Sequence, residues 1–588
     1  MAKHKRRARS VIGIVSCLTV FMLACNKNTD SYSGAYKDAV VQPILFENLS
    51  PVPASGTEGQ VIKFKIIGLD SLKKLYSKNP EGVKFFLNGI ESAIDSITPE
   101  DSTISVTIPP FASSGSASIL IGGDTFFGPQ LKIRGNASID STFNVELTDQ
   151  QGRVILGTGT NGTITRLFFD NAPGESRLFL AGSFTSYNDK TSYLTQYGNK
   201  TEDAFTSYLL PVNPVSGAVL TNFTKGSGPN GPINGILPLT QFPGYLVYGA
   251  NFSVYRTRDG VNNMTRIYTD GKLDSVVRNV FNPTPLNPDL NVDTLPGFTG
   301  GYNSSVIRCF LDAQQRIISI GGFKLHAKNQ YDLSTFYNVS RSYSVANGIS
   351  AQDQAGNLDE TYNFDATGKN YTGANGAITD AVQLLGSGSA YGKIIVTGAF
   401  TSYNGISKSR IMMLDNNGQP DPAFTAGANG TITRITYNKT TRKLLVTGSF
   451  SIFNGTPAPA GLVMLNEDGT RDDSFSPGEF VRSNTSGGQL VTFAGQMDNG
   501  RVIVAGNFEK YKEPAAGDYI TRQGFMILNS KGALVPALNN LGAFRGTIYD
   551  FVETVSADNK KALILAGNFT LFDNTPVGNI IKLRLQPK

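Results

Sequence analysis

The sequence predicts an all-β protein, and three observations carry that prediction. Short runs rich in Val, Ile, Leu, Thr, Tyr and Phe are broken by Asn-Gly and Asp-Gly pairs. Long stretches of helical periodicity are scarce, and the 63 glycines suit many tight turns. One phrase, an apolar run followed by Gly, Phe and a loop, occurs seven times, as in IIVTGAFTSYNG (394–405) and LLVTGSFSIFNG (444–455). A repeated phrase of this kind indicates a fold built from repeated units.

Residues 1–24 are expected to be a secretory signal. The first ten residues carry five Lys and Arg and no acid, and the apolar stretch VIGIVSCLTVFML follows. That stretch is shorter than the ~20 residues that a membrane-spanning helix needs. The four residues ending at Cys25 (MLAC) resemble the lipobox of bacterial lipoproteins, which implies that Cys25 is lipidated and becomes the mature N-terminus. The alternative is an ordinary secretion signal with an incidental Cys. Residues 25–40 are small and polar, as expected of a flexible tether.

The charge balance excludes nucleic acid as an expected partner. Loss of residues 1–24 removes five basic residues and leaves 47 basic and 46 acidic residues, a formal charge of +1. Such a chain has no basic surplus with which to attract phosphates. Cys309 is then the one thiol left beside Cys25, so no disulfide framework is possible within the mature chain.

Residues 41–134 are predicted to be a first domain. The alternation in VIKFKII and TISVTI gives strands with one buried face. Asn88-Gly89 is a hairpin turn signal, and Gly-Pro and Pro-Pro pairs mark further turns. With Pro53, Gly56 and Gly59 before the first long strand, this segment resembles the IPT/TIG family of immunoglobulin-like domains. The resemblance implies a β-sandwich that serves as a spacer or stalk.

Residues 136–588 are predicted to be a β-propeller. One clean copy of the repeat predicts strands at 432–437, 443–450 and 462–465, then an Asp-Gly turn and a short fourth strand ending near Phe475. Four antiparallel strands per unit is a propeller blade, and seven copies predict seven blades. The repeated Phe is expected to be a buried wedge between neighbouring blades, since one blade cannot bury both of its faces alone. The seven are Phe184, Phe252, Phe323, Phe400, Phe450, Phe508 and Phe569.

The phrases LDNNGQPDPAF (414–424) and LNEDGTRDDSF (465–475) resemble the delta-60 repeat propellers of bacteria. The chain begins this region with the end of a repeat, near 138–144, and finishes with the third strand of another, near 579–585. That arrangement implies a closed ring in which the two ends complete one blade. The order of lipobox, IPT/TIG-like domain and propeller resembles Bacteroidota outer-membrane lipoproteins of unassigned function.

The sequence holds few groups for catalysis. His326 is the one His of the mature chain, which excludes His-based triads and His metal clusters, and no phosphate-binding glycine loop occurs. Acids recur three residues before the apolar residue of the fourth strand, where a turn-forming role is preferred to catalysis. These are Asp140, Glu202, Asp274, Asp359, Asp421 and Asp472. The Asp415–Gly418 and Asp468–Gly469 stretches are interpreted as turns rather than calcium loops. No cofactor is expected, and a non-enzymatic protein is favoured.

Loop lengths point to one working face. The links between the first and second strands, and between the third and fourth, barely vary, whereas the other two kinds of link vary widely. Strand parity puts all the variable links on one face, and rigid scaffolds usually carry function on variable loops. The longest segments are 206–232, 278–305 and 324–355. Candidate ligand-contact residues in them are Tyr302, Tyr331 and Tyr337 first, then Phe336, Tyr343 and Tyr208.

The function expected from these observations is a lipid-anchored binding or scaffold protein of the outer membrane. It would present the long-loop face to a glycan, a peptide or an envelope-protein partner. Two alternatives stay open, a glycan-active hydrolase or lyase with acids in the long loops, and a structural subunit of an envelope complex. Two carboxyl groups facing each other in a cleft would favour the enzyme. A large exposed apolar patch would favour the subunit. Whether the protein faces the cell surface or the periplasm stays undecided.

Overall fold

The computed structural model of the protein describes residues 44–148, 154–171, 175–188, 190–191, 207–223, 228–483, 488–514 and 517–586. The predicted signal, Cys25 and the predicted tether lie outside these residues. The described part is nearly all β-structure, and its one α-helix is α2 (Leu69–Lys78). None of the helices in these stretches is long and apolar enough to cross a membrane.

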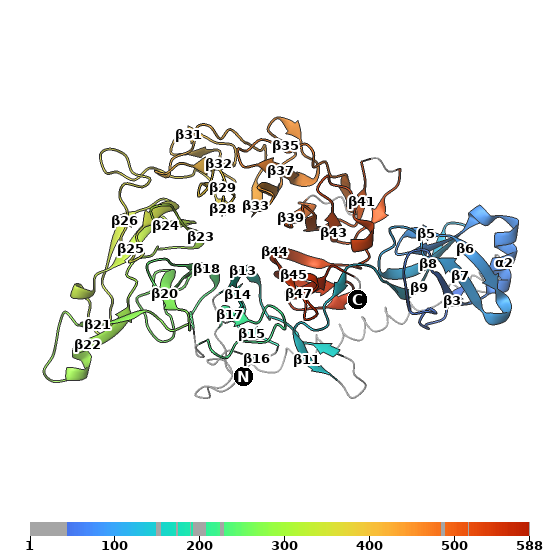
Figure 1. Ribbon diagram of the computed structural model, residues 1–588, viewed down its shortest axis with the longest axis horizontal. Helices are drawn as coiled ribbons and strands as arrows, with labels where there is room; N and C mark the ends of the chain where they lie inside the picture. Colours follow the sequence, from blue (N-terminus) through green and yellow to red (C-terminus); the bar gives the residue numbers. More distant parts are fainter. Residues whose placement is uncertain are drawn as a thin grey trace, which may run out of the picture.

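The N-terminal part is a sandwich of two sheets, drawn in blue at one end of the molecule in Figure 1. The sheets have the orders β1-β3-β7-β6 and β2-β9-β8-β4-β5. Their strands are β1 (Leu45–Phe46), β2 (Ser55–Gly56), β3 (Val61–Ile67), β4 (Val83–Leu87), β5 (Ile90–Ser92), β6 (Ile94–Thr98), β7 (Thr103–Thr107), β8 (Gly115–Ile121) and β9 (Asp124–Ile133).

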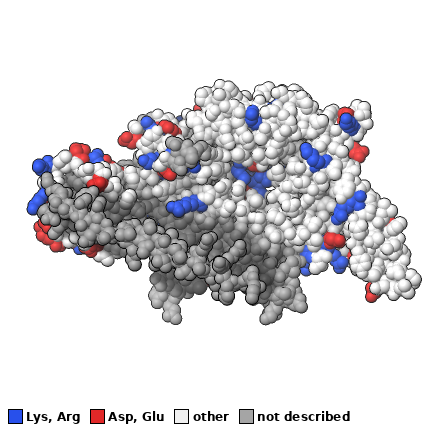
Figure 2. Space-filling view, turned by 180° about the vertical axis from the view of Figure 1, so that it is seen from behind, with Lys and Arg blue, Asp and Glu red and all other residues white. Residues whose placement is uncertain are grey.

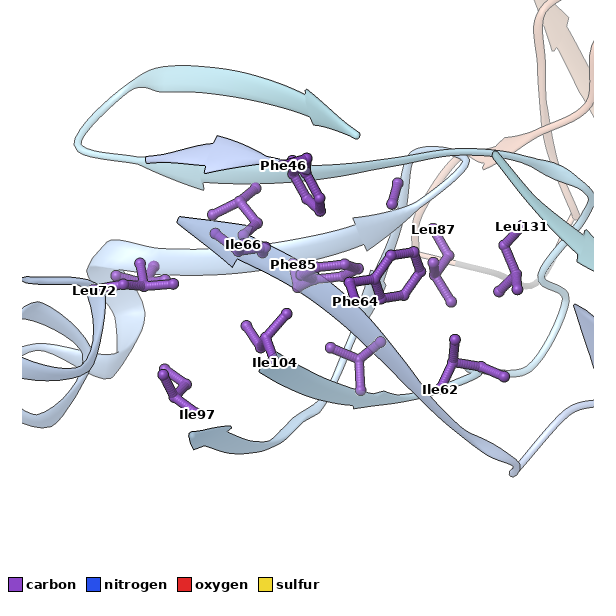
Figure 3. Close-up of a cluster of buried hydrophobic side chains, with 14 of the residues drawn as sticks. Phe46, Ile62, Phe64, Ile66, Leu72, Phe85, Leu87, Ile97, Ile104 and Leu131 are labelled. Atoms are coloured by element: carbon purple, nitrogen blue, oxygen red, sulfur yellow. The ribbon is translucent and has the colours of Figure 1, made fainter. Parts of the chain in front are cut away.

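Alternation along β3 builds the core of this sandwich, as the sequence predicts. Ile62, Phe64 and Ile66 are buried, while the residues between them face outward. Figure 3 shows them packed with Phe85 and Leu87 of the other sheet. The predicted Asn88-Gly89 turn joins β4 to β5, with φ of 45° and 78°. Both residues are thus in the left-handed region that a two-residue hairpin turn needs.

Helix α2 was not among the predicted elements, which were strands throughout this region. Its sequence LDSLKKLYSK places leucines three residues apart, so one side of the helix is apolar. Leu69 and Leu72 on that side are buried in the core of the sandwich. The helix therefore adds its apolar side to the core of the sandwich.

Seven further sheets follow in the described residues, and we number them in chain order. The first six have three antiparallel strands each, in sequence order, and the seventh has the order β10-β47-β45-β44. The strands are β13 (Ile164–Asp170), β14 (Arg177–Gly182) and β17 (Leu209–Val212); β18 (Ile233–Pro238), β19 (Gly244–Gly249) and β20 (Met264–Tyr268); β23 (Val306–Leu311), β24 (Ile317–Gly321) and β27 (Ile349–Gln352); β28 (Ile378–Gln383), β29 (Ile394–Gly398) and β32 (Ile411–Leu414); β33 (Ile432–Asn438), β34 (Lys443–Gly448) and β37 (Leu462–Asn466); β39 (Val491–Gln496), β40 (Val502–Gly506) and β43 (Phe525–Leu528); and β44 (Arg545–Val555), β45 (Lys561–Phe572), β47 (Ile580–Arg584) and β10 (Ser138–Ile139).

Short elements occupy the links between and beside these sheets. The hairpins are β11 (Val145–Thr148) with β12 (Val154–Leu156), β15 (Ser186–Tyr187) with β16 (Lys190–Thr191), β21 (Ser275–Asn279) with β22 (Val292–Pro296), β25 (Leu325–Asn329) with β26 (Arg341–Val345), β30 (Ser402–Tyr403) with β31 (Ile406–Ser407), and β35 (Ile452–Phe453) with β36 (Thr456–Pro457). Strands β38 (Glu479–Val481), β41 (Lys510–Lys512) and β42 (Ile520–Thr521) form a small sheet, and β46 (Thr575–Pro576) pairs with β45. Six 3₁₀ turns are η1 (Pro80–Gly82), η2 (Pro99–Asp101), η3 (Pro288–Asn291), η4 (Tyr331–Leu333), η5 (Pro459–Gly461) and η6 (Pro536–Leu538).

The first strands of the seven sheets contact one another in turn. β13 contacts β18, and the series continues through β23, β28, β33, β39 and β44, which contacts β13 again. Figure 1 shows these strands around the centre of the molecule. The first and last sheets also share an apolar cluster that joins Leu178 and Leu180 to Ile564 and Ile580. The arrangement is propeller-like, with the first strands lining a common axis.

The predicted Phe wedges are confirmed as buried residues. All seven are at most 4% exposed. Each lies in the apolar cluster between its own sheet and the preceding one; Phe450, for example, packs with Leu444 of the fifth sheet and Met413 of the fourth. The phrase therefore repeats because the same packing problem occurs at every sheet-to-sheet contact.

The predicted fourth strands are wrong in extent. In the first six sheets the outer strand is a single isolated bridge, such as Leu414↔Pro420 and Leu465↔Arg471. The recurring acid explains why. Asp421 Oδ1 accepts the amide of Ala423 (2.9 Å), and Asp472 Oδ1 accepts that of Ser474 (3.1 Å), so the chain turns away from the sheet. The turn-forming role predicted for these acids is confirmed at Asp140, Asp359, Asp421 and Asp472.

Two recurring acids differ from the rest. Asp274 binds Arg266 at 2.5 Å, and its backbone carbonyl accepts the amide of Gly297. Glu202 lies outside the described residues. The Asp415–Gly418 and Asp468–Gly469 stretches are turns, as predicted, with Gly418 and Gly469 at φ of 79° and 86°.

The sandwich is fixed to the last two sheets by buried hydrogen bonds. Asn540, which lies between β43 and β44, donates from Nδ2 to the carbonyls of Ile133 (3.2 Å) and Ala137 (2.9 Å). Its own carbonyl accepts the amide of Ser114 (3.0 Å). Lys132 forms an ion pair with the buried Asp573. The N-terminal sandwich therefore has a defined position on the propeller.

Candidate functional site

Two long segments form adjoining hairpins on one side of the propeller. Hairpin β21–β22 lies in the link from the second to the third sheet, and hairpin β25–β26 lies between the second and third strands of the third sheet. Leu295 and Val276 of the first pack against Tyr331 and Val339 of the second. The predicted common location of 278–305 and 324–355 is therefore confirmed. Figure 1 shows both hairpins at the end of the molecule away from the sandwich.

The prediction that 206–232 is a third long loop is wrong. Strand β17 occupies Leu209–Val212 within it, so these buried residues belong to the first sheet and not to a loop. In the turn that follows β17, the carbonyl of Gly217 accepts the hydroxyl of Tyr187 (2.8 Å). Tyr208 directly precedes β17 at φ 67° and packs, half-buried, against the cluster between the first and second sheets. Weak similarity to the repeat hid the third strand of this sheet.

Two of the candidate tyrosines, Tyr302 and Tyr331, are core residues and not exposed loop residues as expected. Tyr302 stacks on Phe323 with ring centroids 3.8 Å apart, and its hydroxyl hydrogen bonds to Ser350 (2.7 Å). The Tyr331 hydroxyl donates to the carbonyl of Pro296 (2.6 Å), and burial raises its pKa to about 12. These rings hold the two hairpins in place, because each hydroxyl finds its partner inside the protein.

The remaining candidates of this region lie nearer the surface. Tyr337 is 78% exposed and meets the half-buried Phe336 edge-on, with centroids 5.2 Å apart. Tyr343 on β26 is also exposed. These three residues are available for contact with another molecule.

The structure adds exposed apolar residues that the aromatic search missed. Leu286, at the tip of the β21–β22 hairpin, is 95% exposed. The amide of Phe281 donates to the carbonyl of Ser334 (2.7 Å), so the two hairpin tips are joined there. We call the exposed apolar side chains of this joint the outer apolar surface; its members are Val277, Phe281, Leu286, Leu333 and Tyr337.

Charged residues are few along the β21–β22 hairpin, which carries three members of the outer apolar surface. Between positions 275 and 296 the charged residues are Arg278, Asp289 and Asp293. In Figure 2, which views the molecule from behind, the corresponding projection at lower right is mostly white. The low charge of this stretch, together with its aliphatic residues, is the sequence signal that could have identified it. Isolated exposed apolar residues are ordinary, but several on two joined hairpins make this surface a candidate interaction site.

A cleft of about 570 Å³ lies on the opposite face, between the short turns of the fourth and fifth sheets. Six charged residues line it, and four of them form ion pairs with one another. Lys393 binds Asp421 at 2.5 Å, and Arg442 Nε binds Glu467 at 3.0 Å. Glu467 also accepts the hydroxyl of Tyr437 at 2.6 Å, with burial and this bond raising the Tyr437 pKa to about 12. The cleft walls are thus held by ion pairs, and the two charges of each pair neutralise each other.

The reactive groups of the described residues are enclosed. His326 is buried, and its Nε2 lies 3.2 Å from Oε1 of Gln352. Burial lowers the His326 pKa to about 4. Cys309 is a free buried thiol, and burial raises its pKa. Over the described ranges, no three His, Cys, Asp or Glu residues are grouped so as to hold a metal ion.

Comparison with known proteins supports the propeller. A family model described as a domain of unknown function (DUF5122) beta-propeller matches residues 392–424 and 441–475, in the fourth and fifth sheets. No curated protein matches the chain. Together with the strand topology, the family match identifies a β-propeller.

Three solved structures are similar at 10% identity, which concerns the fold alone. The WD40 propeller domain of Doa1 covers 72% of this chain and 93% of its own, with a TM-score of 0.30. The Cps50 (Swd1) propeller domain of Myceliophteria thermophila covers 75% and 99%, with a TM-score of 0.32. A protein of unknown function from Bacteroides thetaiotaomicron covers 92% and 98%, with a TM-score of 0.24.

Proposed function

We propose that the protein is a binding scaffold of the bacterial envelope, a closed seven-bladed propeller of delta-60-type repeats carried by an IPT/TIG-like domain. Lipidation at Cys25 attaches it to the outer membrane, as the lipobox resemblance implies. A β-propeller suits an interaction or scaffold role, because its rigid ring holds variable loops in fixed positions. The partner binds at the outer apolar surface.

The exposed apolar tips favour a protein partner over a glycan. Leu286, Val277 and Leu333 offer aliphatic surface without hydrogen-bonding groups, which suits the apolar core of a protein interface. A sugar site instead needs hydrogen-bond donors and acceptors around an exposed aromatic ring. Two of the candidate tyrosines, Tyr302 and Tyr331, are buried in the core. The exposure of Leu286 beside Phe281 and Tyr337 is the observation that carries this proposal.

Site-specific photo-crosslinking in the native envelope tests the proposal. A photo-reactive residue at position 286 or 337 should form a discrete adduct with one envelope protein. The matched control is position 391, since Tyr391 is also exposed but lies in a link of the other face. Adding Leu286→Asp to the position-337 probe should abolish the adduct. Equal adducts at 286 and 391, or none at either position, would contradict the proposal.

A further inference from the structure

Five charged side chains from five different sheets meet on the axis of the propeller. They are Arg166 on β13, Arg308 on β23, Asp380 on β28, Arg434 on β33 and Asp550 on β44. Each occupies the same position of its first strand, where the register with the second strand shifts by a bulge. A bulge re-aims side chains, and bulges are frequent beside functional sites. Because the first strands line the axis, these residues form one cluster, which we call the axial cluster.

The arginines of the axial cluster outnumber its carboxylates. Asp380 forms ion pairs with all three arginines, with Arg308 at 2.6 Å, Arg166 at 3.5 Å and Arg434 at 4.0 Å. Of these three arginines, Asp550 forms an ion pair with Arg166 alone, at 3.3 Å. Asp550 also accepts the backbone amide of Leu167. Three arginines against two aspartates leave one positive charge without a counter-ion within the cluster.

Arg308 holds the unsatisfied hydrogen-bond donor of the axial cluster. Its side chain is only 10% exposed, and its Nε has no hydrogen-bond partner among the described residues. Burial lowers the pKa of Arg308 to about 10, so the group stays protonated at neutral pH. Burial opposes ionisation of Asp380 as well, yet the three arginines hold its pKa below the usual value. A buried donor of this kind is costly unless a partner arrives.

We propose that the axial cluster binds a small oxyanion, a carboxylate or a phosphate, on the propeller axis. Guanidinium groups match the oxygen geometry of both anions and form strong charge-assisted hydrogen bonds with them. The anion would bond to Arg308 Nε and supply the missing negative charge. Arg166 and Asp550 are partly exposed, which leaves the cluster open to solvent on that side. This site is separate from the outer apolar surface and does not depend on it.

Titration calorimetry on the full-length protein in neutral detergent tests the site. Inorganic phosphate and succinate are titrated separately, against chloride at matched ionic strength. Saturable binding of one oxyanion per chain is expected, and the arm that binds identifies the source chemistry. Arg308→Gln should weaken binding about tenfold or more, since one charge-assisted bond is lost. Asp550→Asn should tighten binding, because it removes a competing negative charge.

Arg316→Gln is the matched control. Arg316 is also a partly buried, ion-paired arginine, but it bonds to Asp312 and Asp359 at the rim. Its loss should leave oxyanion binding unchanged. If neither oxyanion binds the wild type, or if Arg308→Gln binds as the wild type does, the proposal is wrong. If Arg308→Gln does not fold, two other variants test the proposal. Arg434→Gln should weaken oxyanion binding, whereas Asp550→Asn should tighten it. Equal affinities in these two variants would overturn the proposal.

Discussion

At the scale of single residues, each residue type that recurs in the repeated phrase has a distinct physical role. Its Phe fills the contact between sheets. Its Tyr donates a hydrogen bond to the carbonyl of the turn glycine of the same sheet, as Tyr403 does to Gly418 and Tyr511 to Gly532. An Asn before the first strand accepts two amides of the loop after the second strand. These asparagines are Asn161, Asn230, Asn303, Asn375 and Asn429.

Phe450→Ala should lower the free energy of unfolding by ~3–5 kcal/mol, as expected for a Phe removed from a packed core. Phe450 meets Phe453 with ring centroids 5.6 Å apart and packs against the fourth sheet. Denaturant unfolding measures the loss. The control is Ile452→Ala, two residues away, because Ile452 is 42% exposed. Equal losses in the two variants would show that Phe450 does not carry the contact.

His326 should make stability fall in mild acid. Burial lowers its pKa to about 4 in the folded protein, against ~6.5 in an unfolded chain. Below pH ~6.5 the unfolded chain therefore binds a proton that the folded protein does not. The stabilisation is complete above that pH and is lost as the pH falls towards 4.

Denaturant unfolding at pH 7 and pH 4 measures this loss by comparing the wild type with His326→Gln. The wild type should lose about 1–3 kcal/mol more than the variant between the two pH values, since each unit of pKa shift is worth ~1.4 kcal/mol. The carboxylates that titrate in the same range are common to both proteins and cancel. Identical pH profiles would mean that His326 is not the group responsible.

At the scale of elements, the sharp end of each outer strand depends on one carboxylate. Asp421 Oδ1 accepts the amide of Ala423, and Oδ2 pairs with Lys393. This pairing and the amide bond lower the Asp421 pKa. The acid therefore both turns the chain and ties the turn to the second strand of its sheet.

Asp421→Ala should cost about 1–2 kcal/mol of stability, comparable to the loss of a helix cap. Asp421→Asn is the matched variant, since it keeps the Oδ1 acceptor and loses only the ion pair with Lys393. That pair is partly exposed, so the Asn variant should cost ~1 kcal/mol or less. Thermal or denaturant unfolding separates the two. A larger loss in the Asn variant would assign the main role to the ion pair.

Asn540→Ala should loosen the sandwich from the propeller without unfolding either. The substitution removes both bonds from Nδ2 and leaves the carbonyl of Ala137 without that donor, while the Ile133 carbonyl keeps the hydroxyl of Ser114 (3.4 Å). Hydrogen exchange of the 133–138 segment should rise, while that of β3 and β34 stays unchanged. The exposed Asn417→Ala serves as the control. Unchanged exchange at 133–138 would show that other contacts hold the sandwich.

At the scale of the whole molecule, the two ends of the repeat region meet in one sheet. Ser138 and Ile139 of β10 pair with Arg584 and Leu583 of β47. The outer position of the seventh sheet is thus filled from the start of the region, as the repeat phase predicted. Within the described residues, this is the one sheet of the seven whose outer strand is more than a single bridge, which suits a contact that joins distant parts of the chain.

Cys25→Ala should release the protein from the membrane fraction, because lipidation at Cys25 is the predicted anchor. Fractionation of cells followed by immunodetection measures this. Cys17→Ala is the matched control, since Cys17 lies within the predicted signal and should not be lipidated. Retention of both variants in the membrane fraction would reject the lipoprotein prediction. Protease treatment of whole cells then shows whether the protein is exposed at the cell surface.

Part of the candidate site followed from the sequence and part did not. Loop lengths and strand parity located hairpins β21–β22 and β25–β26 on one side, because alternation of strand direction needs no side-chain information. The choice of contact residues was wrong for Tyr302 and Tyr331, since aromatic residues in long loops also build the cores of those loops. Leu286 and Phe281 were missed because a single sequence does not distinguish exposed from buried apolar residues.

The sequence by itself determined the all-β class, the repeat, the buried Phe positions and the turns, since each follows from local spacing and turn chemistry. Only the tertiary structure decided where the repeats converge. Arg166, Arg308, Asp380, Arg434 and Asp550 are spread over almost 400 positions, and nothing local marks them as neighbours. The arrangement of the sheets brings the same position of each first strand to a common axis. Residues at that position therefore contact one another although they are far apart in the sequence. The axial cluster therefore exists only where the first strands of these sheets contact one another.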